Sequence, residues 1–294
     1  MKKRIIIIIV AVVLILIGAL LLLQTNRFAH YQSSIKFFFD RPQMEQTEVD
    51  RDDCLTIDVE GLLSGHIEYP SIRVDQSLLL VNSANPVAPE DEFDLVYYKD
   101  TDVLMNAAII EDYSRLSTAV LEHTGDRLFV MSSYRSIQEQ QDVYDEDPTY
   151  AAHPGHSEHH TGLALDVYVY MYAGHGFLQS EAGRFVQSNA HDYGFIIRYP
   201  RGKEEVTGIE YEPWHIRYVG YPHAEFITRS GIAFEEYIEM LETDEFYLYE
   251  GYMISRQAGP TLCVPNCLTD VKISSDHTGY YIITGRTEDD LCYN

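Results

Sequence analysis

Two short stretches of the sequence carry the side chains best suited to chemistry. Residues 154–166 contain the pattern Ser-x-His-x-x-Gly-x-Ala-x-Asp, in which His159 and Asp166 are able to bind a metal. A second stretch, residues 212–215, reads Glu-Pro-Trp-His and adds His215. A catalytic zinc ion needs three protein ligands and one open position. The three side chains therefore suit a catalytic zinc site.

Two further residues would complete a hydrolytic site. Glu212 lies three positions before His215 and is free to act as the general base that takes a proton from a metal-activated water. Arg135 lies between an expected short strand and a helix opened by the capping box of Ser136 and Glu139. Its positive charge suits the place where negative charge develops on a carbonyl oxygen, and one such donor is typically worth about 3 kcal/mol.

The choice among the histidines rests on spacing. The chain has 12 histidines, and four of them crowd the first stretch, namely His153, His156, His159 and His160. Any one of these alone is more often a surface or packed side chain than a ligand. The spacing to Gly162 and Asp166 favours His159 over His160. The joint occurrence of all the motifs, in this order, favours a functional site.

The elements that must position these residues are short and of both kinds. Apolar residues at helical spacing predict a long helix over residues 101–123 and a closing helix that uses Phe234, Tyr237, Ile238 and Leu241. Ser180 is expected to cap another helix, and residues 200–208 to form a hairpin turn. Because helices and strands come in segregated runs, we predict an α+β fold. Strands are expected at 128–131, 163–170, 195–199 and around 214–219.

The N-terminus predicts a membrane anchor. Ile5–Leu23 is an uninterrupted apolar run, long enough for a helix to cross a bilayer. Basic residues at positions 2–4 keep the N-terminus in the cytoplasm and export the chain that follows. The alternative is a cleaved signal peptide, but no small-x-small cleavage site follows the run. We therefore expect a single-pass membrane protein with an extracytoplasmic catalytic domain.

Charge and cysteine content restrict the partners. The net charge of −25 argues against nucleic acid and against adhesion to anionic lipid headgroups. The bilayer is then contacted only through residues 5–23. The four cysteines, Cys54, Cys263, Cys267 and Cys292, permit two disulfides in three possible connectivities outside the cell.

These patterns divide the chain into four parts. A stalk is expected because residues 28–74 show no sustained period and include a charge-rich segment. Short β-like runs after the last helix predict a small β appendage, to which we assign no chemistry. The expected parts are an anchor with its cytoplasmic tip at 1–27, a stalk at 28–74, a catalytic domain at 75–242 and a β-rich extension at 243–294.

The motifs resemble those of a known family. Ser157–Asp166 and Glu212–His215 are similar to the paired motifs of VanY-type D-alanyl-D-alanine carboxypeptidases, and Ser133–Ser136 resembles the arginine motif of that family. This family belongs to a group of zinc peptidases that includes the VanX dipeptidases and hedgehog-like domains. The similarity covers about residues 75–242.

The resemblance implies a function and a set of roles. It implies a small antiparallel sheet flanked by helices, and a substrate that is a peptidoglycan stem peptide ending in D-Ala-D-Ala, from which the terminal D-alanine is removed. It implies one Zn2+ held by His159, Asp166 and His215, with Glu212 as catalytic base, Arg135 as oxyanion stabiliser, and Gln140 and Ser157 on the free carboxylate of the substrate.

Other functions are compatible with the same motifs. An L,D-carboxypeptidase or a peptidoglycan endopeptidase would use the same zinc chemistry and differ only in the pocket beyond the metal. A catalytically inactive wall-binding or sensory module is a further alternative, in which the β extension would carry the binding or sensory function. Such a module would be expected to lose the base or a ligand, whereas this chain retains both.

Overall fold

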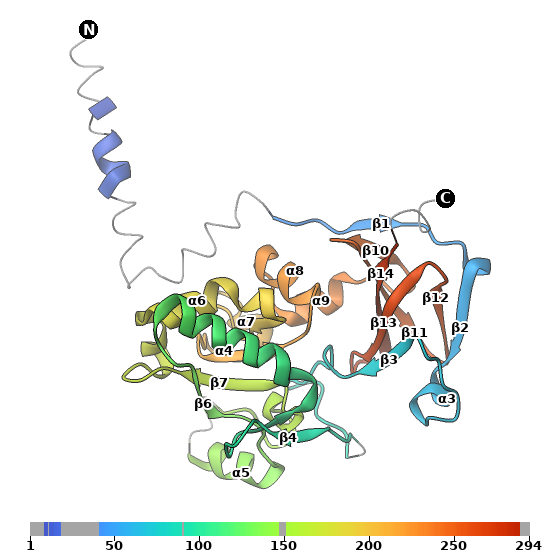
Figure 1. Ribbon diagram of the computed structural model, residues 1–294, viewed down its shortest axis with the longest axis horizontal. Coiled ribbons are helices and arrows are strands. Elements are labelled where there is room, and N and C mark those ends of the chain that lie inside the picture. The colour runs from blue at the N-terminus through green and yellow to red at the C-terminus, as the bar shows by residue number, and fades with distance from the viewer. Residues whose placement is uncertain (1–8, 11, 19–40, 90, 147–150, 289–294) are drawn as a thin grey trace.

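The fold is built on two larger β-sheets that lie side by side, with helices between and around them (Figure 1). The computed structural model describes residues 9–10, 12–18, 41–89, 91–146 and 151–288. One sheet has four strands and the other has six. The mixture of sheets and helices confirms the predicted α+β class.

The four-stranded sheet forms the centre of the catalytic part. Its strand order is β6-β7-β9-β8, and each neighbouring pair is antiparallel. The four strands fall where the alternating and apolar patterns predicted them. They are β6 (Phe129–Ser132), β7 (Ala164–Tyr168), β8 (Phe195–Ile197) and β9 (His215–Tyr218).

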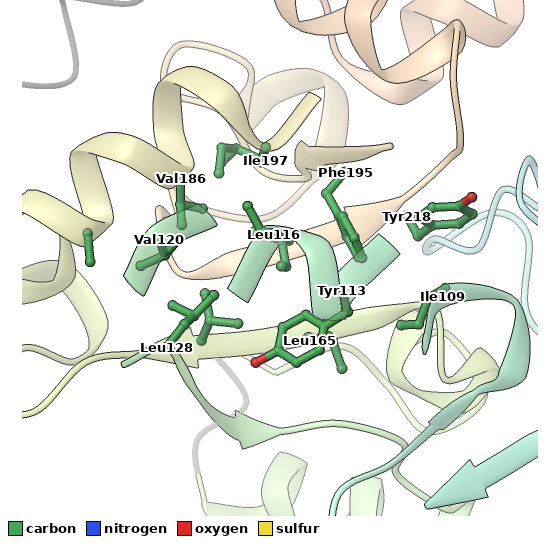
Figure 2. Close-up of a cluster of buried hydrophobic side chains, with 14 of the residues drawn as sticks. Ile109, Tyr113, Leu116, Val120, Leu128, Leu165, Val186, Phe195, Ile197 and Tyr218 are labelled. Atoms are coloured by element: carbon green, nitrogen blue, oxygen red, sulfur yellow. The ribbon is translucent and has the colours of Figure 1, made fainter. Parts of the chain in front are cut away.

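Helices α4 (Ile110–Thr124) and α6 (Glu181–Asn189) cover one face of this sheet (Figure 1). Side chains of a strand alternate between faces, so Leu165 and Val167 point toward these helices while Asp166 points away. Figure 2 shows the resulting core, in which Leu116 and the neighbouring α4 side chains meet the sheet. One face of the sheet is therefore used for stability, and the other is left for the site.

The helix boundaries follow local capping chemistry. The capping box predicted at Ser136 opens α5 (Ile137–Glu146), because the Glu139 carboxylate accepts from the Ser136 backbone N–H at 2.8 Å. The Ser180 hydroxyl caps α6 by accepting from the Gly183 backbone N–H at 2.9 Å. The helix predicted over residues 101–123 begins nine residues later, at Ile110. Strand β5 (Leu104–Asn106), paired with β4 (Leu95–Tyr97), and a 3-10 turn at Ala107–Ile109 precede it.

The six-stranded sheet combines strands from residues 45–75 with strands from residues 246–287. Its order is β1-β10-β11-β14-β13-β3, and all pairs are antiparallel except β13 with β3. A separate pair, β2 (Cys54–Asp58) with β12 (Thr261–Pro265), lies beside it. The six strands are β1 (Glu45–Thr47), β3 (Ile72–Asp75), β10 (Phe246–Tyr249), β11 (Tyr252–Ala258), β13 (Leu268–Ser275) and β14 (Tyr280–Thr287).

The segment expected as a stalk differs from that expectation in its described part. From residue 41 onward it supplies β1, β2, β3 and a short helix α3 (Val59–Leu63), and its strands pair with those of the C-terminal extension. The physical reason is apolar burial, since Ile57 and Ile72 join the hydrophobic cluster of the extension. A disulfide between Cys54 and Cys263 fastens the same two segments, and Cys267 is also disulfide-bonded.

Of the predicted anchor at Ile5–Leu23, residues 5–8, 11 and 19–23 lie outside the described residues. Within the part of the chain that the structure describes, no helix combines the length and the apolar character needed to cross a membrane.

Two helices connect the sheets. The closing helix predicted from Phe234 onward is confirmed as α9 (Phe234–Met240), whereas α8 (His223–Ser230) was not predicted. Residues 200–208, expected as a hairpin turn, contain the single helical turn α7 (Glu204–Thr207). Both α8 and α9 bury apolar side chains against β8 on one side and β10, β11 and β14 on the other. The two sheets are thereby held to one another.

His223 on α8 sits in this interface. Its Nδ1 lies 2.6 Å from the Tyr237 hydroxyl on α9, and its Nε2 lies 3.0 Å from the Thr284 hydroxyl on β14. Burial, with a smaller effect from Lys272, lowers the pKa of His223 to about 3. The folded protein therefore keeps this imidazole neutral at every ordinary pH.

This burial predicts a pH dependence of stability. His223 is protonated below about pH 6.5 in the unfolded chain, but only below about pH 3 in the folded chain. The free energy of unfolding is therefore unaffected by His223 protonation above about pH 6.5. Below that pH it falls by up to about 1.4 kcal/mol per pH unit. We expect His223→Gln to flatten the dependence of the unfolding midpoint on pH between about 6.5 and about 4, measured by circular dichroism. The exposed His66→Gln is the control, and an equally steep dependence in His223→Gln would contradict this role of burial.

Candidate zinc and catalytic site

The pairing of β7 with β9 brings two predicted ligands together. Asp166 is the direct partner of His215 in this antiparallel pair, and Ser132 of β6 is the partner of Asp166 on the other side. Side chains of directly paired residues lie on the same face of a sheet. Asp166 and His215 therefore project together from the face opposite α4 and α6.

A single 3-10 turn supplies the third predicted ligand. His159 lies in the turn Glu158–Thr161, and its backbone N–H donates to the Ser157 hydroxyl at 3.4 Å. Gly162 ends the turn with φ +67°, and a Cβ there would come within 2.7 Å of the Asn106 nitrogen. Only glycine fits both conditions. The glycine of the motif thus sets the direction in which His159 enters the site.

The three side chains converge through defined atoms. His159 Nε2 lies 3.3 Å from Asp166 Oδ2, and His215 Nδ1 lies 3.0 Å from Asp166 Oδ1. One potential ligand atom from each residue lies within 4.8 Å of the others, and all three residues are buried. Among the described residues, these three form the group of histidine, cysteine and acidic side chains that lie close enough together to hold a metal ion.

The hydrogen bonds around these atoms fit a metal ion. His159 Nδ1 lies 2.7 Å from the carbonyl oxygen of Ser133, which only accepts, so Nδ1 carries the proton and Nε2 keeps a lone pair. That lone pair faces Asp166 Oδ2 at 3.3 Å, and the other carboxylate oxygen, Oδ1, is buried without a hydrogen-bond partner. Buried acceptors that face one another are unfavourable unless a proton or a metal ion lies between them. Two imidazoles and one carboxylate are ligands that zinc prefers.

The charges of the site are strongly coupled. Burial alone would raise the pKa of Asp166, but His159 and His215 outweigh it and hold that pKa well below its usual range. Burial would likewise lower the pKa of His215, but its contacts with Asp166 and Glu158 raise it to about 9. The cluster therefore attracts positive charge, whether a proton or a metal ion.

Glu212 lies next to the ligands without joining them. Its Oε2 is 3.5 Å from His215 Nδ1, and its side chain lines the same cavity. Burial raises the pKa of Glu212 to about 7, and His215 limits the rise. A carboxylate with a pKa near neutrality takes and returns a proton efficiently. The predicted base thus has both the position and the proton affinity that its role requires.

Arg135 lines the same cavity and is held by two neighbours. Its guanidinium donates to Gln140 Oε1 and to Ser132 Oγ, both at 2.7 Å. The Gln140 amide in turn donates to the carbonyl oxygen of Ala152 at 2.7 Å. Gln140, almost fully buried, is thus the residue that orients Arg135. Its predicted contact with substrate stays a prediction.

The cavity beside the ligands has a volume of about 160 Å³. Arg135, Ser157 and Glu212 line it together with Gln140 and the three metal-competent residues. Tyr199 and Trp214 provide aromatic walls, and the Tyr199 ring packs 4.8 Å from the His215 ring. All the predicted site residues therefore meet in one cavity.

Sequence reasoning missed two neighbours of His159. His160 accepts the Gly155 N–H at Nε2 (3.0 Å) and donates from Nδ1 to the carbonyl oxygen of Arg135 (2.7 Å), so it ties the arginine loop to the ligand turn. Glu158 is completely buried, with its Oε2 3.8 Å from His215 Nε2. Nothing in the local pattern marks either role, because the decisive contacts join segments distant in sequence.

Comparison with known proteins agrees with this geometry. Residues 102–221 match the family model described as VanY, D-alanyl-D-alanine carboxypeptidase. A D-alanyl-D-alanine carboxypeptidase from Enterococcus faecium is 31% identical over 247 residues, which cover 77% of this chain and 79% of the relative. The similarity therefore extends beyond the motifs.

Solved structures show the same relationship. The vancomycin resistance D,D-dipeptidase VanXYg, solved in complex with a D-Ala-D-Ala phosphinate analog, is 26% identical with a TM-score of 0.63, covering 83% of this chain and 100% of that one. A mutant of the D,D-pentapeptidase VanY from the VanB-type resistance cassette, solved in complex with Zn(II), is 32% identical with a TM-score of 0.51. That match covers 55% of this chain and 98% of the other.

Proposed function

The chain belongs to the VanY family of D-alanyl-D-alanine carboxypeptidases, and from this premise we propose that it is a zinc-dependent enzyme that removes the terminal D-alanine from peptidoglycan stem peptides. The observation that carries the proposal is the convergence of His159, Asp166 and His215 beside a cavity with Glu212 and Arg135. The relatives solved with a D-Ala-D-Ala analog and with Zn(II) support the substrate and the metal.

The metal ligands and the base have distinct roles in this proposal. Zinc held by the three ligands would act as a Lewis acid that polarises the scissile carbonyl and activates water at neutral pH. Glu212 accepts the proton of the attacking water and returns it to the leaving amine of D-alanine. Its raised pKa, about 7, allows both transfers near neutral pH.

Arg135 stabilises the negative charge that develops on the scissile carbonyl oxygen. Its guanidinium is fixed by Gln140 and Ser132, so it needs no reorganisation during the reaction. Ser157 lines the same cavity, and with Gln140 it is our candidate for holding the free carboxylate of the substrate.

We expect the full chain in detergent to release D-alanine from a stem pentapeptide, as detected by mass spectrometry of both products. A chelator should abolish release, and added zinc should restore it. Glu212→Gln should lower kcat by about 10²- to 10⁴-fold, because the proton acceptor is lost. Glu210→Gln, an exposed carboxylate two positions earlier, is the matched control and should keep full activity.

The same assay separates the alternatives. Preferred cleavage of a tetrapeptide would make the protein an L,D-carboxypeptidase, and cleavage of cross-linked dimers would make it an endopeptidase. Zinc-loaded, folded protein that releases nothing from any of these substrates would overturn the proposed activity. Undiminished release by Glu212→Gln would remove Glu212 from its role as base.

We also propose that residues 5–23 anchor the protein in the membrane with the catalytic domain outside the cytoplasm. The apolar run and the basic residues before it support this orientation. The disulfide between Cys54 and Cys263 supports an oxidising compartment, because such bonds rarely persist in the cytosol. The proposed substrate, which is part of the cell wall, lies in the same compartment.

The anchor makes a separate prediction. In fractionated cells the full chain should remain with membranes after extraction at alkaline pH, and external protease should digest it in intact spheroplasts. A chain lacking residues 1–27 should lose the membrane association. Recovery of the full chain in the soluble fraction, or protection from external protease, would contradict the anchor without affecting the proposed reaction.

A further inference from the structure

A cluster of four buried charges lies directly behind the ligand His215. Glu158, Arg198 and Arg217 are completely buried, and Glu235 on α9 is nearly so. Glu158 Oε1 accepts from Arg198 Nε and from Arg217 Nη1, both at 2.7 Å. Arg198 also forms a two-pronged pair with Glu235, with distances of 2.6 and 2.9 Å. The cluster contains two positive and two negative charges and is balanced.

The backbone fixes this cluster in place. Arg217 lies on β9, two residues after His215, and donates to the carbonyl oxygens of Ser77 (3.0 Å) and Leu79 (2.8 Å). Guanidinium contacts of this kind hold a carboxylate in one orientation. Because both arginines bind Oε1, the Glu158 carboxylate is prevented from turning, and its Oε2 faces a single direction.

That direction is toward His215. Glu158 Oε2 is buried and has no hydrogen-bond partner, and the same is true of His215 Nε2, which lies 3.8 Å away. The other ring nitrogen, Nδ1, faces Asp166 and Glu212 at 3.0 and 3.5 Å. For Nδ1 to present a lone pair to a metal, the proton of the neutral imidazole must sit on Nε2. Glu158 Oε2 is the acceptor placed to receive it.

We propose that Glu158 is a positioning residue for the metal site: its Oε2 accepts Nε2–H of His215 and thereby fixes the ring and the tautomer that offers Nδ1 as ligand. Metal-binding histidines commonly donate their second nitrogen to a carboxylate in this way. The 3-10 turn Glu158–Thr161 thus serves two ligands at once, since His159 binds directly and Glu158 supports His215. This inference rests on the proposed zinc dependence.

Glu158→Gln is the decisive variant, because the orientation of its new amide is forced. Arg198 and Arg217 only donate, so the amide oxygen must face the two guanidinium groups, and the amide NH2 group must face His215. An NH2 group beside Nε2 favours an unprotonated Nε2 and a proton on Nδ1, which is the wrong tautomer for the metal. We expect zinc affinity to fall by about 10- to 100-fold.

Glu235→Gln is the matched control. It removes a carboxylate from the same cluster and disturbs Arg198, but Glu235 contacts Arg198 and Asn82 rather than His215. Both variants should unfold at lower temperature than the wild type. Only Glu158→Gln should lose zinc affinity, measured on the full chain in detergent by competition with a chromophoric chelator.

The outcomes distinguish the two proposals. Wild-type protein that fails to bind zinc would overturn the zinc dependence itself. If the wild type binds zinc and Glu158→Gln binds it equally well, or if Glu235→Gln loses as much affinity, the positioning role is wrong. Should Glu158→Gln fail to fold, Glu158→Asp keeps the charge but shortens the side chain by one methylene. It should fold and still bind zinc more weakly, and unchanged affinity would overturn the role.

Discussion

The antiparallel register of β7 and β9 is the constraint on which the site depends. Pairing Asp166 with His215 places two proposed ligands side by side, and a slip of one residue in either strand would turn its proposed ligand into the hydrophobic core. That core holds the register, because Leu165 and Ile216, the next pair along, are completely buried beneath α4 and α6. Packing on one face of the sheet therefore determines the chemistry on the other.

The buried charges around the site connect it to the rest of the molecule. Arg217 and Arg198 reach from the sheet to residues 77–79 and to α9, so the segments that enter and leave the catalytic part meet behind His215. Burying ions is costly and is tolerated only when their hydrogen-bonding groups are satisfied. A cluster of this kind contributes little to stability in itself. It holds the segments behind His215 in fixed positions beside the cavity that Glu212 and Arg135 line.

Much of this was predictable because it is local. Spacing within one short motif predicted His159 and Asp166, and a second motif predicted Glu212 and His215. The structure brings His159, Asp166 and His215 together, while the roles of all four in zinc binding and catalysis stay predictions. Capping chemistry located the start of α5. The pairing of β2 with β12 was missed for two reasons. The two strands are far apart in sequence, since the disulfide between them joins cysteines 209 positions apart. Neither strand has a marked alternation of apolar and polar residues. Glu158 was missed for a related reason: its partners come from other segments, and a motif does not show where a neighbouring side chain points.

The most direct test of this arrangement is a crystal structure of the zinc-loaded protein with anomalous scattering recorded at the zinc edge. We predict one zinc ion bound by His159 Nε2, an oxygen of Asp166 and His215 Nδ1, with Glu212 beside it and Glu158 within hydrogen-bond distance of His215 Nε2. Zinc bound at another place, or bound to His215 through Nε2, would contradict the proposed site.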